Sequence, residues 1–576
     1  MEDIFLPLIN SPTISVCDKI EYRVEEMREK LTNNITLTSL ANSHAEAYTL
    51  KSPHGRKAKG QFFTPPEISN FMSGLFILPK TPSIKISLLD PGAGAGILAA
   101  GFCNAVLAKN YKKVSLHIDL YEKDVDVLPF LKKTIAACHL KFRDRGWNLT
   151  YRIINADFIL ANLNVAQSQM LLEANPAKDR YDYIVSNPPY FKLNADSPET
   201  VLLKDFTSGQ PNIYVFFMII SMLLLKPKGQ LVFITPRSFC SGLYHMKFRK
   251  WLIDHYSIEN IHNFDSRKNV FYNEDVLQES IIIKVRNTKP FAPNQKVTVS
   301  QSNDSTFSDH TEGKFPYADI FHHEDAFIKI PANKEELAIS KILQKWNLTF
   351  QSLGMSVSTG PVVPFRAKQY LVSSADSKEK LTPLLWMHNI QGLDVRWPLD
   401  KAGKEKYIST SDQTKNILLP AKNYILLKRF TSKEQQRRLY AGVLLGTDVK
   451  SKYIGIENHL NYIHKKNGNI PADEAFGIAA FLNTSIVDCF FRSINGNTQV
   501  NAGDLRALPL PPFAKLKEIG RQVRVQKCLP GNKLDLLVAK ILAIPANLLH
   551  LKDDNEQDKT GYTDSKRLGA AACAAK

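Results

Sequence analysis

A short glycine-rich loop between an apolar strand and an apolar helix constrains the fold of this chain more than any other feature. A strand is expected over residues 86–90, the loop PGAGAG spans 91–96, and a helix is expected over 97–107. Glycines let the backbone bend and approach a ligand closely. This order is typical of the first unit of a nucleotide-binding α/β domain. The loop does not match G-x-G-x-x-G, and no Lys-Ser or Lys-Thr follows it, so a P-loop is excluded.

Two further strands are expected to end at acidic residues. The strand over 114–121 leads to Glu122, whose carboxylate can accept both hydroxyls of a ribose. The strand over 149–154 leads to Asp157 and Phe158, where a carboxylate can accept an adenine amino group beside an aromatic ring. For Glu122 taken alone, a solvated charge at a strand end is the better interpretation.

A fourth strand, over 183–186, precedes the segment Asn187-Pro188-Pro189-Tyr190. The side-chain carbonyl of Asn187 and the backbone carbonyl of Pro188 are adjacent acceptors that suit the two N–H groups of an exocyclic amine. Drawing both hydrogens toward acceptors leaves the nitrogen lone pair free to attack. The prolines fix φ and remove competing donors, and Tyr190 offers a face on which a planar base can stack. An isolated N-P-P-Y is as often a proline-rich turn, but four strand-end signals in order favour a site.

The ordered motifs resemble the gamma class of N6-adenine DNA methyltransferases, the TaqI-type enzymes of restriction–modification systems. The set comprises GQFFTPPE at 60–67, the 90–96 loop, Glu122, Asp157-Phe158 and 187–190, and it spans about residues 55 to 290. The resemblance implies an α/β fold: a Rossmann-like domain dependent on S-adenosylmethionine (AdoMet), followed by a mixed α+β target-recognition domain. It also implies double-stranded DNA as the substrate. One departure is that Glu122 lies farther beyond the loop than the roughly 20 residues of a short βαβ unit.

The resemblance also implies roles for individual residues. Thr64 and the loop with Asp90, Gly92, Gly94 and Gly96 would hold the methionine part of AdoMet, Glu122 the ribose, and Asp157 with Phe158 the adenine. Asn187 and Pro188, with Pro189 in the same rigid turn, would hold the target amine, and Tyr190 would stack on a flipped base. Phe271 would pack against the other face of that base, with Tyr272 as the second candidate and a core aromatic as the alternative.

The composition agrees with a nucleic-acid enzyme. The chain has 576 residues, enough for two or three domains, and its 74 Lys and Arg against 56 Asp and Glu give a net charge of +18. This excess favours a polyanionic partner. The start Met1-Glu2-Asp3-Ile4 lacks the basic region of a signal peptide, and the longest apolar stretch, 213–225, is too short to span a bilayer. We therefore expect no membrane association and a cytoplasmic, nucleoid-associated protein of a bacterium or archaeon.

No metal site or disulfide is expected. The seven cysteines form no C-x-x-C pair, which is typical of reduced thiols in a cytoplasmic protein. His322-His323 with Glu324 is the nearest approach to a metal cluster, and a solvated loop is the better interpretation. Direct displacement of a methyl group needs no metal.

The sequence predicts six parts. They are a helical segment (1–55), the AdoMet-binding catalytic domain (56–290), a linker or insertion (291–329), a target-recognition DNA-binding domain (330–515), a second helical segment (516–551) and a disordered tail (552–576). No endonuclease motif is recognised, so we expect a monomeric modification enzyme whose cognate restriction endonuclease is encoded separately.

The predicted target-recognition domain contains cations interleaved with aromatic rings. Lys428 and Arg429 are candidates for DNA contact, although such charge runs are more often solvated faces. Segments 357–360, 456–459 and 497–506 resemble target-recognition parts of the same enzymes. In the last of them, Gln499, Asn501 and Arg506 either serve base edges or pin a loop, and the sequence leaves both open.

Two other classes of function remain as alternatives. An RNA base methyltransferase or a protein glutamine methyltransferase also uses N-P-P-Y, but the glutamine enzyme would not need a second basic domain of this size. A non-catalytic DNA-specificity module would have no reason to keep both an intact glycine loop and N-P-P-Y.

Overall fold

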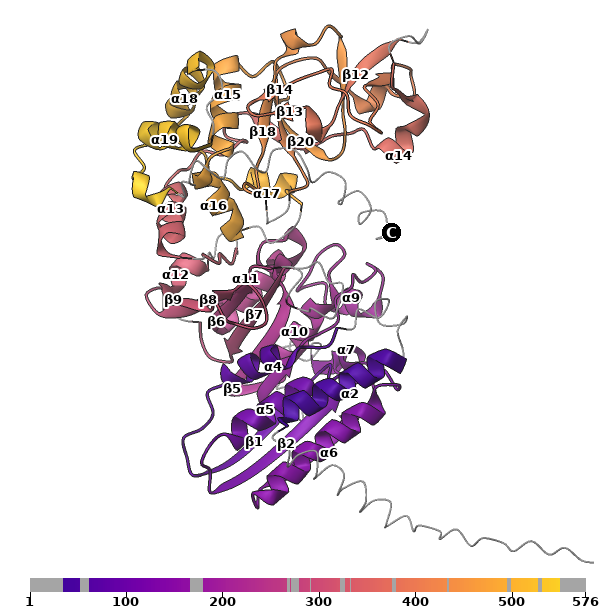
Figure 1. Cartoon of the computed structure of the whole chain (residues 1–576), viewed down its shortest axis with the longest axis vertical. Helices are drawn as coiled ribbons and strands as arrows, with labels where there is room; N and C mark the ends of the chain where they lie inside the picture. The colour runs from indigo at the N-terminus through magenta and orange to yellow at the C-terminus, as the bar shows by residue number, and fades with distance from the viewer. Residues whose placement is uncertain are drawn as a thin grey trace, which may run out of the picture. The chain divides into compact units, whose positions relative to one another are not determined.

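The computed structural model (Figure 1) divides the chain into two compact units, the first ending at Ala318 and the second containing the chain from Phe327 onward. It describes residues 35–51, 62–165, 180–266, 270, 279–290, 292–321, 327–331, 333–374, 380–431, 435–494, 499–526 and 531–549. The predicted tail from 552 and the metal candidates at 322–324 lie outside the described residues.

The first unit is built on a nine-stranded sheet with the order β3-β2-β1-β4-β5-β7-β6-β8-β9. The strands are β1 (Ser83–Asp90), β2 (Lys113–Tyr121), β3 (Asn148–Ile154), β4 (Tyr181–Ser186), β5 (Leu225–Pro236), β6 (Ser257–Phe264), β7 (Ser280–Arg286), β8 (Lys296–Ser302) and β9 (Thr311–Pro316). Strands β1 to β5 are parallel, and β7 runs antiparallel between β5 and β6. The predicted α/β fold is confirmed.

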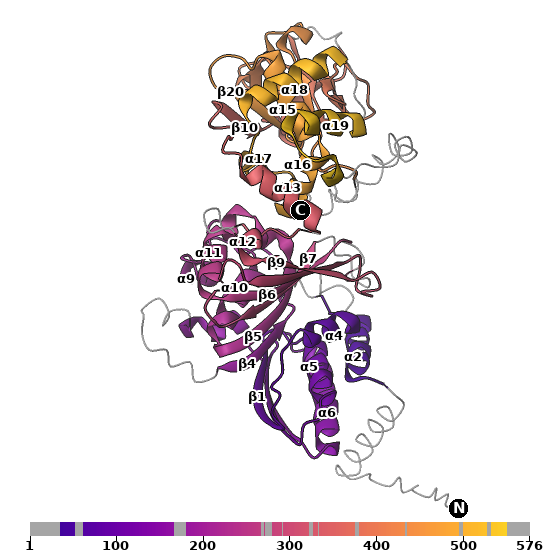
Figure 2. The ribbon, with the colours of Figure 1, turned by 90° about the vertical axis from the view of Figure 1, so that its left-hand side faces the viewer.

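Helices cover both faces of this sheet. Figure 2 shows α2 (Leu37–Lys51), α4 (Pro66–Gly74), α5 (Ile97–Leu107) and α6 (Leu128–Asp144) on one side. On the other side lie α9 (Pro198–Leu202), α10 (Ile213–Leu223) and α11 (Met246–His255), while the short α7 (Phe158–Ala161) follows β3. Every residue of α10 is buried, as expected for an apolar core helix. Apolar burial on both faces explains the hydrophobic runs at 183–185 in β4, 231–234 in β5 and 281–283 in β7.

The predicted linker over 291–329 is wrong for much of its length. Residues 296–302 form β8, which pairs in parallel with β6, and residues 311–316 form β9, which pairs with β8. Val297 and Phe315 are buried apolar residues in these strands, set among polar neighbours. The alternation of buried and exposed positions is weak in such a polar segment, which is why the composition suggested a linker.

The second unit combines two sheets with a group of helices. The strand order is β10-β20-β17-β18-β14-β13 in one sheet and β11-β15-β12-β19-β16 in the other. The strands are β10 (Met355–Thr359), β11 (Leu371–Val372), β12 (Leu381–Leu385), β13 (Ile390–Gln391), β14 (Asp394–Val395), β15 (Tyr407–Ser409), β16 (Leu418–Pro420), β17 (Tyr424–Lys428), β18 (Ala441–Leu444), β19 (Tyr453–Ile456) and β20 (Leu460–Lys465). The helices are α13 (Lys334–Gln344), α14 (Pro364–Ala367), α15 (Ala472–Leu482), α16 (Ser485–Ile494), α17 (Ala502–Arg506), α18 (Phe513–Gln526) and α19 (Gly531–Leu542).

The C-terminal helices are part of the second unit's core. Helix α18 packs closely against α15, because a Cβ on Gly477 would lie 1.9 Å from the carbonyl oxygen of Leu516. Leu516 and Val538, from α18 and α19, belong to the same buried cluster as β17 and α15. The segment predicted as a separate helical part therefore completes this unit. Within the described residues, no single helix is long and apolar enough to cross a bilayer, and α15 and α16 reach that length only as a pair bent by 62°.

Candidate functional site

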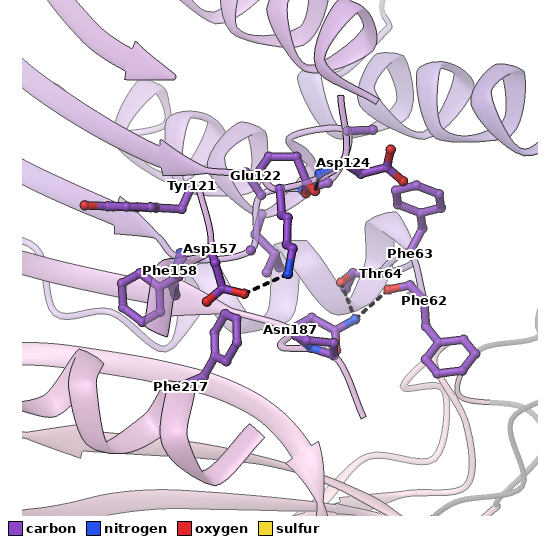
Figure 3. Close-up of a pocket in the computed structure, with 18 of the residues that line it drawn as sticks. Phe62, Phe63, Thr64, Tyr121, Glu122, Asp124, Asp157, Phe158, Asn187 and Phe217 are labelled. Carbon is purple, nitrogen blue, oxygen red and sulfur yellow. Dashed lines mark hydrogen bonds and ion pairs between the residues drawn. The ribbon is translucent and has the colours of Figure 1, made fainter. Parts of the chain in front are cut away.

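A cavity of about 510 Å³ lies at the carboxyl ends of β1 to β4 in the first unit. Strands β2 and β4 lie on opposite sides of β1 in the sheet. After β1 the chain continues to β2, and after β4 it continues away from β1 toward β5. The loops after β1 and β4 therefore diverge and leave a crevice between them. Figure 3 shows the labelled lining side chains around this crevice. The lining residues include Phe62, Phe63, Thr64, Gly92, Gly94, Tyr121, Glu122, Lys123, Asp124, Asp157, Phe158, Asn187, Pro189, Phe191 and Phe217.

The glycine loop makes a tight turn over the floor of the cavity. Gly94 and Gly96 have φ angles of +52° and +87°, which side chains rarely tolerate. A Cβ on Gly96 would also lie 2.9 Å from Cδ1 of Leu131. The amide of Gly94 donates to Oε2 of Glu122 across 2.8 Å, so the loop after β1 is tied to the end of β2.

Glu122 is a buried carboxylate with both oxygens engaged. Its Oε1 accepts the amide of Asp124 at 2.7 Å, while Oε2 accepts that of Gly94. Burial raises the pKa of Glu122, and the two amide bonds oppose this shift. Each carboxylate oxygen can accept a further bond, so Glu122 can still bind two hydroxyl groups of a ligand.

Asp90, at the end of β1, is a second buried carboxyl group. It lies beneath the cavity rather than on its lining, and its Oδ1 is 3.5 Å from the amide of Gly92. Among the described residues, Oδ2 has no hydrogen-bond partner. Burial raises the pKa of Asp90 to about 8, and the negative charge of Glu122 adds to the shift. A nearby cation would satisfy this oxygen and reverse the shift.

Asp157 and Phe158 begin α7 at the far wall of the cavity. Asp157 caps this helix, with Oδ1 accepting the amides of Ile159 and Leu160 at 3.1 Å each. Its Oδ2 pairs with Nζ of Lys123 at 3.0 Å, a lysine whose side chain is largely exposed. Because a solvated pair of this kind contributes little, a ligand group can displace Lys123 from Oδ2.

Phe158 packs against two other aromatic rings. Its ring lies 5.2 Å from that of Tyr121, edge to face, and 5.2 Å from that of Phe217 on α10. Phe217 lines the cavity but was not singled out from the sequence, because the run over 213–225 indicates only a buried helix. Ile213 also lines the cavity and lies one helical turn before Phe217. A helical projection of the sequence would therefore have placed both residues on the same face of the helix.

Asn187 lines the cavity, and both the nitrogen and the oxygen of its side-chain amide are hydrogen-bonded. Its Nδ2 donates to the carbonyl oxygen of Phe62 at 3.0 Å and to Oγ1 of Thr64 at 3.1 Å, drawn as dashed lines in Figure 3. Its Oδ1 accepts the hydroxyl of Tyr190 at 2.5 Å. The amide therefore has a defined orientation, with nitrogen toward the Phe62–Thr64 segment and oxygen toward Tyr190.

Tyr190 lies between two other aromatic rings. It is near-parallel to Phe62, with 6.0 Å between ring centroids, and meets Tyr214 edge to face at 6.2 Å. Burial raises the pKa of its phenol, so the hydroxyl is protonated at neutral pH and acts as a donor. Its ring is half-buried in this arrangement.

The cavity brings together most of the residues expected for a cofactor and for a target amine. Thr64, Gly92, Gly94, Glu122, Asp157, Phe158, Asn187 and Pro189 line it, whereas Asp90, Gly96, Pro188 and Tyr190 are next to lining residues. Gly60, Gln61, Phe271 and Tyr272 lie outside the described residues. Among the described residues, no group of three His, Cys, Asp or Glu side chains could hold a metal ion.

In the second unit, several cations gather around the end of β17. Nζ of Lys428 lies 4.9 Å from the ring centroid of Tyr440, and Lys404 stands 4.1 Å over Trp386. Burial and the neighbouring Lys401 lower the pKa of Lys428. A half-buried ammonium group beside another cation favours an anionic ligand.

The other predicted DNA contacts are engaged within the protein. The guanidinium of Arg429 donates to the carbonyl of Asn458 at 3.1 Å and to Oε1 of Gln499 at 3.4 Å. Asn501 caps α17 through a reciprocal contact with Asp504.

The three segments that resemble target-recognition parts contact one another in the second unit. Arg506, from 497–506, donates to the carbonyl of Val357 at 2.7 Å. The amide of Gly360 donates to the carbonyl of Leu460, just after 456–459, at 2.8 Å. A Cβ on Gly360 would lie 2.2 Å from the carbonyl oxygen of Glu457, so only glycine fits there. In this arrangement Asn501 caps α17 and Arg506 ties α17 to β10.

Comparison with known proteins finds relatives of this chain among methyltransferases. Residues 102–271 match the family model described as Eco57I restriction-modification methylase. The Type II methyltransferase M.BsuBI of Bacillus subtilis is 35% identical over 467 residues, which cover 81% of this chain and 90% of that protein. The Type II methyltransferase M.PstI of Providencia stuartii is 33% identical over 492 residues, covering 85% and 94%. The solved DrdV–DNA complex aligns at a TM-score of 0.46 with 13% identity, covering 89% of this chain and 62% of that chain.

Two relatives above 30% identity thus align along most of the chain. The chain belongs to the Type II methyltransferases of restriction–modification systems.

Proposed function

We propose that the protein transfers a methyl group from AdoMet to N6 of adenine within a specific site in double-stranded DNA. The single observation that carries the proposal is the fixed amide of Asn187 at the wall of the cavity, with its oxygen turned away from Phe62 and Thr64. An oriented carbonyl acceptor beside a second one, on Pro188, suits the two N–H groups of an exocyclic amine.

The residues around the cavity fit AdoMet. Among the described residues Oδ2 of Asp90 has no hydrogen-bond partner, and it suits the ammonium group of the methionine part of AdoMet. Gly92 and Gly94, which line the cavity, have no side chains, so their backbone can approach that part of the cofactor closely. Glu122 would accept the ribose hydroxyls. Asp157 would accept the adenine amino group through Oδ2, and Phe158 and Phe217 would flank the ring.

The chain's own residues position the reaction rather than take part in bonds. AdoMet, when bound, supplies an electrophilic methyl group on a sulfonium. Asn187 Oδ1 and the Pro188 carbonyl accept the two amino hydrogens, so that the nitrogen lone pair points away from the ring plane. Held in this way, the amine nitrogen would be oriented toward the methyl group that AdoMet supplies, and its proton would leave to solvent. Rate comes mainly from positioning and electrostatics.

The target adenine must leave the helix, because its amino group cannot reach such a cavity from within the duplex. Tyr190 would stack on the extruded base, with Phe271 as the candidate for the opposite face. Target recognition is assigned to the second unit, where Lys428, Lys401 and Lys404 form a cationic group suited to phosphate. We further propose that the enzyme acts as a monomer and protects DNA against a separately encoded endonuclease.

The test is to incubate the purified protein with AdoMet and a library of random duplexes, then map the modified bases and analyse hydrolysed nucleosides by mass spectrometry. We expect N6-methyladenine at one short sequence. N4-methylcytosine would overturn the base assignment, since cytosine also presents an exocyclic amine. Modification only of RNA or of a glutamine peptide would support the alternative substrate classes, and no modification of any substrate would support a specificity module without catalysis.

A further inference from the structure

Thr64 faces both the cavity and the side chain of Asn187. It is 5% exposed, lines the cavity and lies two residues ahead of α4. Its Oγ1 accepts Nδ2 of Asn187 at 3.1 Å, and the carbonyl oxygen of Phe62 accepts the same nitrogen at 3.0 Å. Figure 3 shows Thr64 and the Phe62 carbonyl converging on that nitrogen from one side.

A carboxamide presents either a donor or an acceptor, depending on a half-turn about its terminal bond. If the amide of Asn187 turned, its oxygen would face the Phe62 carbonyl, which cannot donate, although the Thr64 hydroxyl could still donate to it. The nitrogen would then face Tyr190 and the space assigned to the target amine, where two donor groups would oppose each other. The Phe62 carbonyl therefore selects the orientation of the amide, and the Thr64 hydroxyl holds the amide in place. Only the present orientation offers an acceptor to an amine.

We propose that Thr64 is a positioning residue for methyl transfer, whose hydroxyl acts with the Phe62 carbonyl to hold the Asn187 amide with Oδ1 toward the target amine. This inference rests on the proposed function of Asn187. It differs from the role that the family resemblance implies for Thr64, which is contact with the methionine part of the cofactor. The two roles have different kinetic consequences, and the structure allows them to be separated.

The local backbone makes Thr64 a rigid acceptor. It precedes Pro65, and a residue before proline is confined to extended conformations. Pro65 has φ of −58°, and its carbonyl accepts the amide of Ser69 at 3.0 Å, which ties the segment to the first turn of α4. A β-branched side chain also has few χ1 rotamers. The hydroxyl therefore loses little entropy when it fixes Asn187.

The test compares Thr64→Val, which keeps the shape and removes the hydroxyl, with Thr64→Ser, which keeps the hydroxyl. The measurements are the single-turnover rate constant with DNA and AdoMet both saturating, and the dissociation constant of AdoMet by calorimetry. For Thr64→Val we expect the rate constant to fall about threefold to tenfold, as for loss of one neutral hydrogen bond, with AdoMet affinity changed by less than about twofold. Thr64→Ser should restore most of the rate.

The matched control is Thr38→Val. Thr38 is also fully buried in the first unit, and its hydroxyl also accepts an asparagine Nδ2, that of Asn104 at 3.4 Å, but it does not line the cavity. This variant should methylate at the wild-type rate. If Thr64→Val does not fold, the pair Thr64→Ser and Thr64→Ala isolates the same hydroxyl.

Three results would overturn the inference. They are a wild-type rate constant for Thr64→Val at saturating AdoMet, a loss confined to AdoMet affinity, and a slow Thr64→Ser variant. Failure of the proposed function is distinguishable, because Asn187→Ala would then also methylate normally. If Asn187→Ala is inactive while Thr64→Val is unaffected, only the role of Thr64 is refuted.

Discussion

The hydroxyl of Tyr190 donates a hydrogen bond to the side-chain oxygen of Asn187 across 2.5 Å. The acceptor that we assign to the target amine is therefore engaged by the protein itself when no base is present. The same hydroxyl is 3.2 Å from the carbonyl oxygen of Ile234, which gives it a second acceptor. A carbonyl oxygen has two lone pairs, so Tyr190 can share Asn187 with a base or turn fully to Ile234.

We expect Tyr190→Phe to keep most of the methyl transfer, because the ring still stacks and the Asn187 amide is still held by Thr64 and Phe62. Tyr190→Ala should capture the base poorly and transfer slowly, since stacking contributes roughly 1–3 kcal/mol per base. The measurement is the single-turnover rate, together with the fluorescence of 2-aminopurine at the target position. Fluorescence should rise when wild-type enzyme binds, although quenching by Tyr190 limits the gain.

An equal loss in Tyr190→Phe and Tyr190→Ala would contradict this expectation. It would mean that the hydroxyl bond to Asn187, and not the ring face, is what the reaction needs. A normal rate in both variants would remove Tyr190 from the proposed base site.

Asn187→Ala removes the oriented acceptor while leaving the glycine loop, Glu122 and Asp157 in place. We expect AdoMet to bind with wild-type affinity and methyl transfer to fall by orders of magnitude. Calorimetry and a radiolabelled methyl-transfer assay on the same preparation check the two halves of this prediction. Near-normal turnover would exclude the role assigned to Asn187.

The core of the first unit was predictable because its signals are local. The apolar strands before Asp90, Glu122 and Asn187 and the glycine loop specify a parallel sheet in which those residues share one edge. Strands β8 and β9, at one end of the sheet, were missed because polar residues alternate with few apolar ones, so that their composition resembles a loop.

The hydrogen bonds inside the site could not be predicted. The contact between Thr64 and Asn187 joins residues 123 positions apart in the chain, and no spacing rule reports such a pair. Lys123 was likewise not expected beside Asp157, since its position follows from the register of β2 against β3. The sequence indicates which residue types meet at a sheet edge, whereas side-chain partners depend on packing.

Asp157→Asn separates ligand binding from helix capping. Asparagine is as good an N-cap as aspartate, so α7 should keep its cap and the melting temperature should change little. The amide nitrogen would replace the acceptor Oδ2, and we expect AdoMet binding to weaken by roughly 1–3 kcal/mol through the lost acceptor. Thermal unfolding and calorimetry measure the two effects.

Lys123→Ala is the control for the ion pair. It removes the solvated partner of Oδ2 but leaves the acceptor, so AdoMet affinity should be close to that of the wild type. Unchanged affinity in Asp157→Asn would mean that this residue only caps the helix.

The boundary at Ala318 defines a fragment for testing the division of labour. A fragment that ended near Asn303 would remove β9 from the edge of β8, whereas residues 1–318 retain the whole first sheet. The longer fragment should bind AdoMet like the full chain and lose sequence-specific DNA binding. The affinity of the full chain for DNA should fall steeply with salt through counterion release. Site-specific binding by residues 1–318 alone would contradict the assignment of target recognition to the second unit.

Asp90 predicts a proton release linked to cofactor binding. Its pKa is about 8 in the free protein because of burial, so the carboxyl group is mostly protonated at pH 7. If the ammonium group of AdoMet lies near Oδ2, binding lowers that pKa and expels the proton. Affinity should therefore increase as pH rises toward 8, and decrease above it because an α-amino group, with a pKa of about 8, loses its own charge.

Calorimetry at pH 7 in two buffers of different ionisation enthalpy should report the release of about one proton, from the linkage between binding and pKa. Asp90→Asn, which carries no titrating group, should bind AdoMet without proton release. A binding enthalpy of the wild-type protein that does not depend on the buffer would show that Asp90 is not the partner of the ammonium group.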